Sequence, residues 1–276
     1  MTVDAQQSRA AGARTRSVVR VTLDAGAAAR DDVLAVEEPL EIRVNGRGYA
    51  VTMRTPGDDE DLAAGFLVSE GVVRSAADLG SINVLEGPGH VIDVEVGGPG
   101  ALVAMDRQRH VYTTSSCGVC GLASIDAVAT TSQHDVTTDG VRVSADVLAA
   151  LPEGLREQQS LFESTGGVHA AGLFDALGTA VVVREDVGRH NAVDKVVGRA
   201  MRDGTLPLRG HVLQVSGRAS FELVQKAAMA GIPVLAAVSA PSSLAVELAE
   251  SVGVTVVGFS RGASFNVYSR PDRVLS

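Results

Sequence analysis

The sequence contains no tryptophan, and aromatic residues make up only 3 % of its 276 positions. So few rings argue against the aromatic platforms on which proteins stack the bases of single-stranded nucleic acid. The formal net charge of −9 at pH 7 also disfavours general binding of polyanions. We therefore expect no nucleic-acid partner, and any phosphate site has to be a local group of basic residues.

Long apolar runs are missing as well. No segment approaches the roughly 20 consecutive apolar residues that span a membrane, and residues 1–17 lack the apolar core of a secretory signal. These features predict a cytoplasmic protein with no membrane partner and with a disordered tail over residues 1–17. The rest of the chain is long enough for one large domain or two small ones, and 45 % of all residues are hydrophobic.

After this tail, the first half has the pattern of β-strands. Asn45 and Gly46 separate two strand-like runs, and this dipeptide favours the two-residue turn of a β-hairpin. Acidic residues open a helical stretch at 58–71, which ends at a glycine. Further strands are expected at residues 18–23, 90–96 and 101–106. The pattern predicts a strand-rich N-terminal domain over residues 18–112.

The second half alternates apolar strands with amphipathic helices. Strands are expected at residues 179–186, 211–217, 233–240 and 254–262. Helices are expected at residues 189–204, 218–231 and 242–253. This alternation is typical of an α/β domain with a parallel or mostly parallel sheet that helices cover on both faces. We assign this domain to residues 113–276.

The loops that follow these strands suggest a phosphate site, because ligands of open α/β sheets bind at the carboxyl ends of the strands. Arg189, Arg218 and Arg261 each lie beside a glycine in these loops. Glycine lets the backbone approach a ligand closely, and arginine binds phosphate oxygens bidentately. The loops also contain the hydroxyl groups of Ser216, Ser242 and Ser243. The alternative is that each arginine caps or pairs within its own loop.

The densest polar stretch lies where the strand at 179–186 meets the following helix. It contains Asp186, His190, Asn191, Asp194 and Lys195. Two acids, a histidine and a lysine at this edge favour a role in binding or orientation, whereas the alternative is a helix cap with a solvated ion pair. His169 lies in a glycine-flanked stretch that predicts a tight loop.

The only two cysteines, Cys117 and Cys120, stand two residues apart in SSCGVCGL. Structural zinc would need four ligands, and zinc deaminases need a glutamate near the ligand histidine and a proline before the first cysteine; the chain lacks both. A thioredoxin-like disulfide would need a compact βαβ frame around the motif. A glycine-flanked loop also suits a reactive thiolate that relays sulfur. The residues leave redox chemistry and sulfur relay as close alternatives.

Five blocks of the chain, in this order, resemble the FdhD family of formate dehydrogenase accessory sulfurtransferases. They are CGVCG, GGVHAAGLF, REDVGRHNAVDKVVG, the segment from Ser216 to Glu250, and GFSRGASFNVYS. The resemblance extends from about Glu37 to the C-terminus. It implies a cytidine-deaminase-like, three-layer sheet domain at the C-terminal side and a smaller strand-rich N-terminal domain.

The resemblance also implies a function. Such a protein accepts sulfur from a cysteine desulfurase as a persulfide on Cys117, with Cys120 as its partner. It delivers the sulfur to Mo-bis(molybdopterin guanine dinucleotide), bound as a substrate, for a formate dehydrogenase. The family suggests a homodimer with no metal ion of its own. The alternatives are a non-catalytic cofactor-binding chaperone and a zinc-dependent, deaminase-like hydrolase.

Two groups of residues are candidates for cofactor binding. The segment that corresponds to the family's cofactor contacts comprises Phe259, Ser260, Arg261, Gly262, Ala263 and Ser264. The neighbouring loops add Arg189, His190, Lys195, Ser216, Gly217 and Arg218. In this hypothesis the arginines hold the phosphates, and His169 lies near the path of the sulfur.

Overall fold

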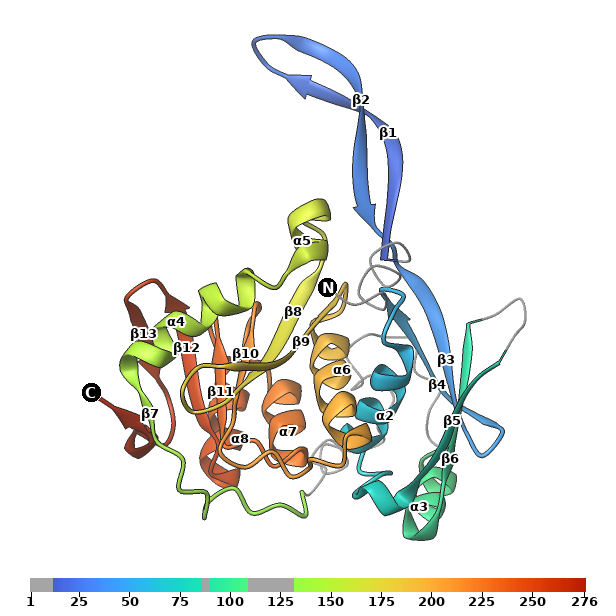
Figure 1. Ribbon diagram of the computed structural model, residues 1–276, viewed down its shortest axis with the longest axis vertical. Helices are drawn as coiled ribbons and strands as arrows, with labels where there is room; N and C mark the ends of the chain where they lie inside the picture. The colour runs from blue at the N-terminus through green and yellow to red at the C-terminus, as the bar shows by residue number, and fades with distance from the viewer. Residues whose placement is uncertain (1–11, 86–89, 109–131) are drawn as a thin grey trace.

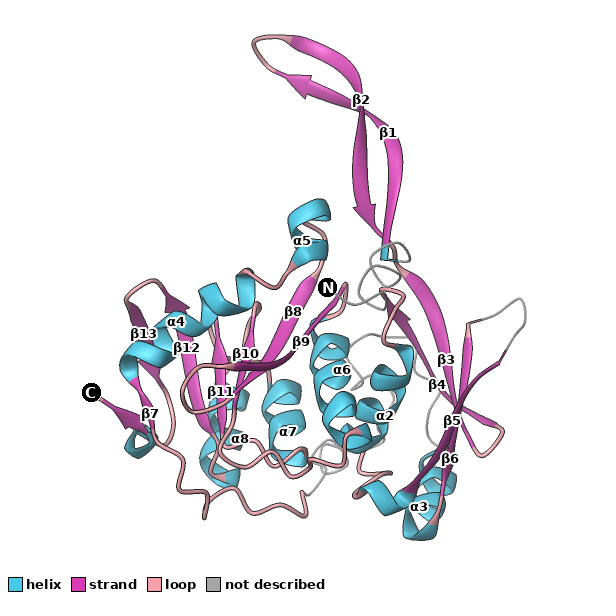
Figure 2. Cartoon of the chain, viewed as in Figure 1, coloured by secondary structure: helices cyan, strands magenta, loops and turns pink. Residues whose placement is uncertain are grey.

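The computed structural model describes residues 12–85, 90–108 and 132–276, and it shows two β-sheets with their helices and a long projecting arm (Figure 1). Helices cluster between the two sheets and against the larger one (Figure 2). Cys117 and Cys120 lie outside the described residues. No helix in the described ranges is both long and apolar enough to cross a membrane.

The arm is an antiparallel hairpin of β1 (Ala13–Thr22) and β2 (Gly26–Ala35), paired along its full length. It extends away from the body of the molecule (Figure 1), and most of its side chains are exposed. The strand expected at 18–23 belongs to it. Because β1 starts at Ala13, the expectation of a disordered tail is wrong for residues 13–17; residues 1–11 lie outside the described residues.

The smaller sheet has the order β4-β3-β6-β5. Its strands are β3 (Glu38–Val44), β4 (Arg47–Arg54), β5 (Leu79–Leu85) and β6 (Val91–Val96). Asn45 and Gly46 have φ angles of 52° and 76°, so the predicted hairpin is confirmed with the left-handed turn that this dipeptide favours. Helix α2 (Asp59–Ser69), which was also predicted, follows this hairpin.

The strand expected at 101–106 is wrong, because these residues lie in helix α3 (Gly98–Gln108). A short apolar run does not by itself distinguish a strand from a helix. Pro99 at the start of the run fits the first turn of a helix, where its missing N–H has no intrahelical partner to lose.

The larger sheet is mixed and has the order β13-β12-β11-β10-β8-β9. Its strands are β8 (His169–Phe174), β9 (Ala180–Asp186), β10 (Val212–Val215), β11 (Val234–Ala237), β12 (Thr255–Arg261) and β13 (Ser264–Val267). The expected parallel arrangement holds for β10, β11 and β12, whereas β8 and β13 are antiparallel to their neighbours. A short parallel pair, β7 (Val143–Ser144) and β14 (Val274–Leu275), lies apart from it.

Helices cover this sheet on both faces, because its strands bury apolar side chains alternately on each side. Val212 of β10 packs in a cluster with α4 (Ala145–Arg156), and the next residue, Leu213, packs in the cluster that contains the opposite helices. Those helices are α6 (Arg189–Arg202), α7 (Phe221–Met229) and α8 (Ser243–Val252). The short helix α5 (Ser160–Thr165) continues from α4 toward the base of the arm (Figure 1).

Helix α2 packs against α6 and joins the two sheets. Gly65 of α2 and Gly198 of α6 meet at the crossing, where an added Cβ on either one would overlap a backbone carbonyl of the other helix. One hydrophobic cluster runs from Ile42 and Leu62 in the first half to Val193 and Leu213 in the second. The segments 18–112 and 113–276 therefore share a core.

Candidate functional site

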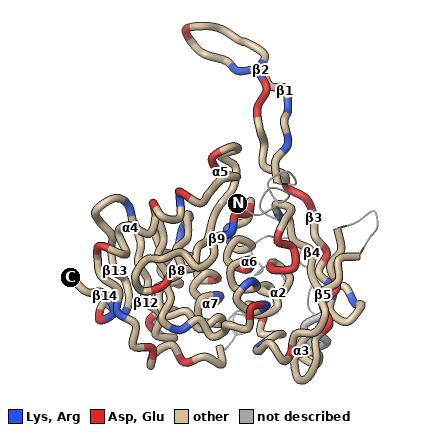
Figure 3. The backbone as a smooth tube through the Cα atoms, viewed as in Figure 1, with Lys and Arg blue, Asp and Glu red and all other residues tan. Residues whose placement is uncertain are grey.

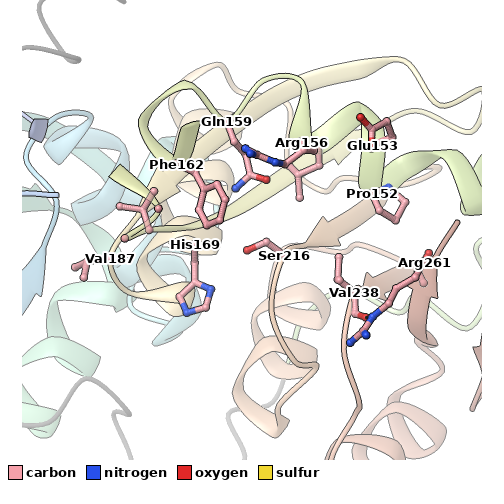
Figure 4. Close-up of a pocket in the computed structure, with 15 residues that line it drawn as sticks. Pro152, Glu153, Arg156, Gln159, Phe162, His169, Val187, Ser216, Val238 and Arg261 are labelled. Carbon is pink, nitrogen blue, oxygen red and sulfur yellow. The ribbon is translucent and has the colours of Figure 1, made fainter. Parts of the chain in front are cut away.

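The loops singled out in the sequence meet at one edge of the larger sheet. Because β8 is antiparallel to both β9 and β10, β9 runs in the same direction as β10, β11 and β12. Their carboxyl ends therefore lie together, beside the start of β8. A cavity of about 630 Å³ opens at this edge, bounded on its other side by α4 and α5 (Figure 4).

Arg261 lines the cavity from the end of β12. Its Nε donates to the carbonyl oxygen of Val238 at 3.0 Å, which directs the guanidinium along the sheet edge and leaves its terminal nitrogens available to a ligand. Ser264 pairs with Arg261 across the turn made by Gly262 and Ala263. Those three residues are exposed but do not line the cavity.

Ser260 also lines the cavity, and its hydroxyl has a structural task. Pro152 lies inside α4 and has no N–H to donate to the carbonyl of Leu148, four residues earlier. The buried hydroxyl of Ser260 donates to that carbonyl at 3.3 Å instead. Ser260 therefore ties α4 to β12 and cannot donate the same proton to a phosphate. Phe259, just before it, is 43 % exposed and has a φ angle of 53°.

Ser216 and Gly217 follow β10. The Ser216 hydroxyl accepts a hydrogen bond from the backbone N–H of Ala170 at 2.9 Å, and its own proton is available to the cavity that it lines. An ideal Cβ on Gly217 would lie 3.6 Å from His169 Nδ1 and 3.7 Å from Arg189 Cδ. Gly217 therefore lies next to both side chains, at distances that are ordinary van der Waals contacts.

His169 lies in strand β8, paired with Asp186 of β9, so the expected tight loop is wrong. Gly166 makes the turn, with a φ angle of 64°, and the strand begins three residues later. His169 lines the cavity. Burial lowers the pKa of its imidazole, and the neighbouring Arg189 and His190 lower this pKa further. The ring is therefore a neutral hydrogen-bonding group near neutral pH.

Arg189 and Arg218 border the cavity residues without lining the cavity themselves. Arg189 is the first residue of α6; its Nε is buried and has no hydrogen-bond partner within the described part of the chain. Arg218 is exposed. With Arg261 they place three guanidinium-bearing residues on neighbouring loops. Basic and acidic residues are otherwise interspersed along the described chain (Figure 3), so these arginines are a local feature of an acidic protein.

His190 faces the start of α7. Its Nε2 lies 2.7 Å from a carboxylate oxygen of Glu222 and 3.3 Å from the hydroxyl of Ser220. These contacts orient the imidazole between the N-termini of α6 and α7. His190 is buried and does not line the cavity, so it has no direct contact with a ligand there.

Lys195 was predicted to contact the cofactor, but the structure places its ammonium in a buried network of hydrogen bonds. It is 1 % exposed, and its ammonium pairs with Asp186 at 2.8 Å and donates to the carbonyl oxygens of Thr55 and Glu185. An ammonium has three N–H donors, so none is left for a phosphate. The polar stretch at the start of α6 therefore fastens the two halves of the protein together.

The other polar residues of this stretch are structural as well. Asn191 donates to Asp186 and to the carbonyl oxygen of Met53. Asp194, which the alternative interpretation placed in a solvated pair with Lys195, is buried and pairs with Lys226 at 2.8 Å. Among the serines, Ser242 caps α8 by accepting from the N–H of Ala245, and Ser243 is exposed at its first position.

Sequence reasoning missed the wall of the cavity formed by α4 and α5. Arg156, Gln159 and Phe162 line it there, and the Arg156 guanidinium carbon lies 4.5 Å from the centroid of the Phe162 ring. Pro152 and Gly154 inside the segment conceal its helical pattern. The amphipathic spacing of Leu148, Leu151 and Leu155, all buried, is the signal that could have revealed it.

Comparisons with known proteins agree on one family. A model described as the FdhD/NarQ family matches residues 35–275. A sulfur carrier protein FdhD from Streptomyces coelicolor is 57 % identical over 268 residues, which is 94 % of each chain. A protein of the same name from Saccharolobus solfataricus is 43 % identical over 260 residues, covering 93 % of this chain and 96 % of the relative.

A solved structure has a similar fold. It is a crystal structure described as a formate dehydrogenase accessory protein from Desulfotalea psychrophila. It aligns with a TM-score of 0.75 at 27 % identity, covering 95 % of this chain and 99 % of that chain.

Proposed function

Since the chain belongs to the FdhD/NarQ family, we propose that it carries sulfur for the maturation of a formate dehydrogenase. The donor is a cysteine desulfurase, and Cys117 holds the sulfur as a persulfide, with Cys120 as the second thiol of the pair. The acceptor is Mo-bis(molybdopterin guanine dinucleotide), which the protein binds as a substrate in the cytoplasm. The working unit in this proposal is a homodimer.

The first transfer is a thiol–persulfide exchange. The thiolate of Cys117 attacks the terminal sulfur of the desulfurase persulfide, a new S–S bond forms on Cys117, and the S–S bond of the donor breaks. The donor cysteine leaves as a thiolate, and the exchange involves no net oxidation or reduction. This step needs one accessible thiolate.

The observation that supports a nucleotide-bearing acceptor is the cavity at the sheet edge. Its volume of about 630 Å³ lies within the range of about 300–1,000 Å³ that is usual for small-molecule sites. Arg261 and Ser216 reach it from two strand ends, and arginine is the residue that best binds the oxygens of a pyrophosphate. Such a cavity accommodates one nucleotide end of the cofactor.

The residues around the cavity have separate roles in this proposal. Arg261 and the hydroxyl of Ser216 bind the phosphates, and Ser260 holds α4 in place. Arg189 and Arg218 extend the cationic edge, His190 and Gly217 border it, and Phe259, Gly262, Ala263 and Ser264 form the exposed turn over which the remainder of the cofactor lies. His169 contacts the ligand as a neutral imidazole. Lys195 is left out, because all its donors are used.

Calorimetry with guanosine diphosphate tests this site. Replacing Arg261 with Ala removes a charged hydrogen-bond partner worth about 1.5–3 kcal/mol, so we expect the Kd to rise at least about tenfold. Arg47→Ala is the matched control, because Arg47 is exposed on the β3–β4 hairpin, away from this edge. Equal affinities of the Arg261→Ala and Arg47→Ala proteins would remove Arg261 from the site.

A further inference from the structure

The end of the cavity formed by α4 and α5 carries an amide side chain that makes no hydrogen bond to the described part of the chain. Gln159 is only 5 % exposed and lines the cavity. Its backbone N–H donates to the carbonyl of Arg156, but its side-chain amide makes no hydrogen bond within the described residues. The amide faces the cavity and can both donate and accept hydrogen bonds there. An amide in this position is available to pair with a ligand in the cavity.

A flat surface lies beside this amide. The Arg156 guanidinium stacks on the ring of Phe162, with 4.5 Å between the guanidinium carbon and the ring centroid, and both side chains line the cavity. Figure 4 shows Gln159, Arg156 and Phe162 grouped on one side of the cavity, with Arg261 on the other. Planar cations and aromatic rings are the side chains on which heterocyclic rings stack. This end of the cavity is therefore suited to a flat, polar ring.

We propose that Gln159, Arg156 and Phe162 bind the 2-amino-4-oxopyrimidine ring that guanine and pterin share. This inference rests on the proposed function, which supplies a substrate that contains both rings. An amide offers an acceptor oxygen next to N–H donors. The shared ring offers the complementary set on one edge, namely a carbonyl acceptor next to N–H donors. The ring lies at the α4–α5 end, and the phosphates extend toward Arg261.

Calorimetry with three probes tests the assignment: guanosine diphosphate, pyrophosphate and neopterin. Gln159→Leu keeps the volume of the side chain and removes the amide. We expect the Kd for guanosine diphosphate to rise about tenfold or more, with no change for pyrophosphate, which has no ring. Arg261→Ala weakens the binding of both phosphate ligands. Gln158→Leu is the matched control, because Gln158 is exposed one position earlier on the same segment.

Neopterin separates the two possible sources of the ring. If Gln159→Leu abolishes neopterin binding along with the loss for guanosine diphosphate, this end accepts either ring. If neopterin does not bind the wild-type protein while guanosine diphosphate does, the ring is guanine. Phe162→Ala, which removes the stacking surface, should weaken the same probes as Gln159→Leu.

Thermal unfolding separates ligand binding from a structural role for Gln159. Because the amide is unpartnered, Gln159→Leu should leave the Tm unchanged or raise it, whereas loss of a structural amide would lower it. An unchanged Kd for guanosine diphosphate in Gln159→Leu would overturn the inference and leave the proposed function standing. If the wild-type protein bound neither guanosine diphosphate nor pyrophosphate, the cavity itself would fail as the cofactor site.

Discussion

The carboxylate of Asp186 is fully buried and is held by the backbone N–H groups of Thr55 and Gly188, by Asn191 and by the ammonium of Lys195. These contacts link the strand that ends at Asp186, the start of α6 and the segment after β4. A buried charge that loses its partner is strongly destabilising. At the scale of single residues, we therefore expect the pair of Asp186 and Lys195 to stabilise the fold and not to bind the ligand.

Replacing Lys195 with Met tests this distinction. The free energy of unfolding should fall by about 3 kcal/mol or more, because Asp186 is left without its counter-charge. The Kd for guanosine diphosphate should stay at the wild-type value. Urea unfolding and calorimetry measure the two quantities. The double variant Lys195→Met/Asp186→Asn should recover part of the lost stability; a weakened ligand affinity at normal stability would return Lys195 to the site.

His169 gives the protein a dependence on pH. Folding lowers the pKa of His169 through burial, with Arg189 and His190 adding to the effect, so the folded state binds the proton less well than the unfolded state. The stabilising contribution is complete above the ordinary value of 6.5 and is lost as the pH falls below it. His169→Asn should therefore show a smaller loss of stability than the wild type between pH 7.5 and pH 5.5 in urea unfolding.

Burial also lowers the pKa of His134, so part of the loss remains in the single variant. Between pH 7.5 and pH 5.5, the free energy of unfolding should therefore fall least in the combined His134→Asn/His169→Asn protein. If the free energy of unfolding of His169→Asn falls as much as that of the wild type, the His169 imidazole is equally easy to protonate in the folded and unfolded chains.

At the scale of elements, the crossing of α2 and α6 decides how the two sheets are joined. The helices approach so closely that their backbones touch at Gly65 and Gly198, where a Cβ would overlap the carbonyl oxygens of Asp194 and Asp61. Helix backbones cannot shift without disturbing the buried pair of Asp194 and Lys226 nearby. The close approach therefore needs glycine on both helices.

Gly65→Ala should destabilise the protein by about 3 kcal/mol or more, at or beyond the upper end of the usual effect of overpacking. The measurement is the free energy of unfolding in urea. Gly140→Ala is the control, because nothing lies within 4 Å of an added Cβ there, and its effect should stay within about 0.5 kcal/mol. Similar unfolding midpoints for the two variants would show that the helices separate easily.

The elements also show what could be predicted from the sequence. The Asn45-Gly46 turn and the helices α2, α6 and α8 carry local signals, such as turn residues, acidic first turns and apolar periodicity, and they were found. Helix α4 was missed because Pro152 normally breaks a helix. The hydroxyl of Ser260, more than a hundred residues away, satisfies the carbonyl that Pro152 leaves free. A compensation of this kind is not visible in a local pattern.

Some residues of the candidate site could likewise be predicted from the sequence, and others could not. Arg261 and Ser216 could be predicted, because they follow buried strands and strand ends meet at one edge. Lys195 was wrongly included, since nothing in the sequence shows that its ammonium faces the carbonyl of Thr55 in the other half of the chain. Gln159 and Phe162 were absent from the prediction, because their importance depends on the cavity that α4 and α5 complete.

At the scale of the whole molecule, the two sheets form one body with a shared hydrophobic cluster, and the arm stands apart from it (Figure 1). The family model starts at residue 35, where β2 ends, so the match falls on the body that holds the cavity. The cavity lies at the edge of the larger sheet, next to α4 and α5. The smaller sheet is joined to the larger one through the packing of α2 against α6. The body therefore contains every residue to which we assign a role in binding.

The most direct test of the account is the mass of the protein after incubation with a cysteine desulfurase and cysteine. We expect the wild-type chain and Cys120→Ala to gain sulfur, and Cys117→Ala to gain none, because our proposal assigns the persulfide of the exchange to Cys117. If Cys117→Ala gains as much sulfur as the wild type, Cys117 is not the carrier.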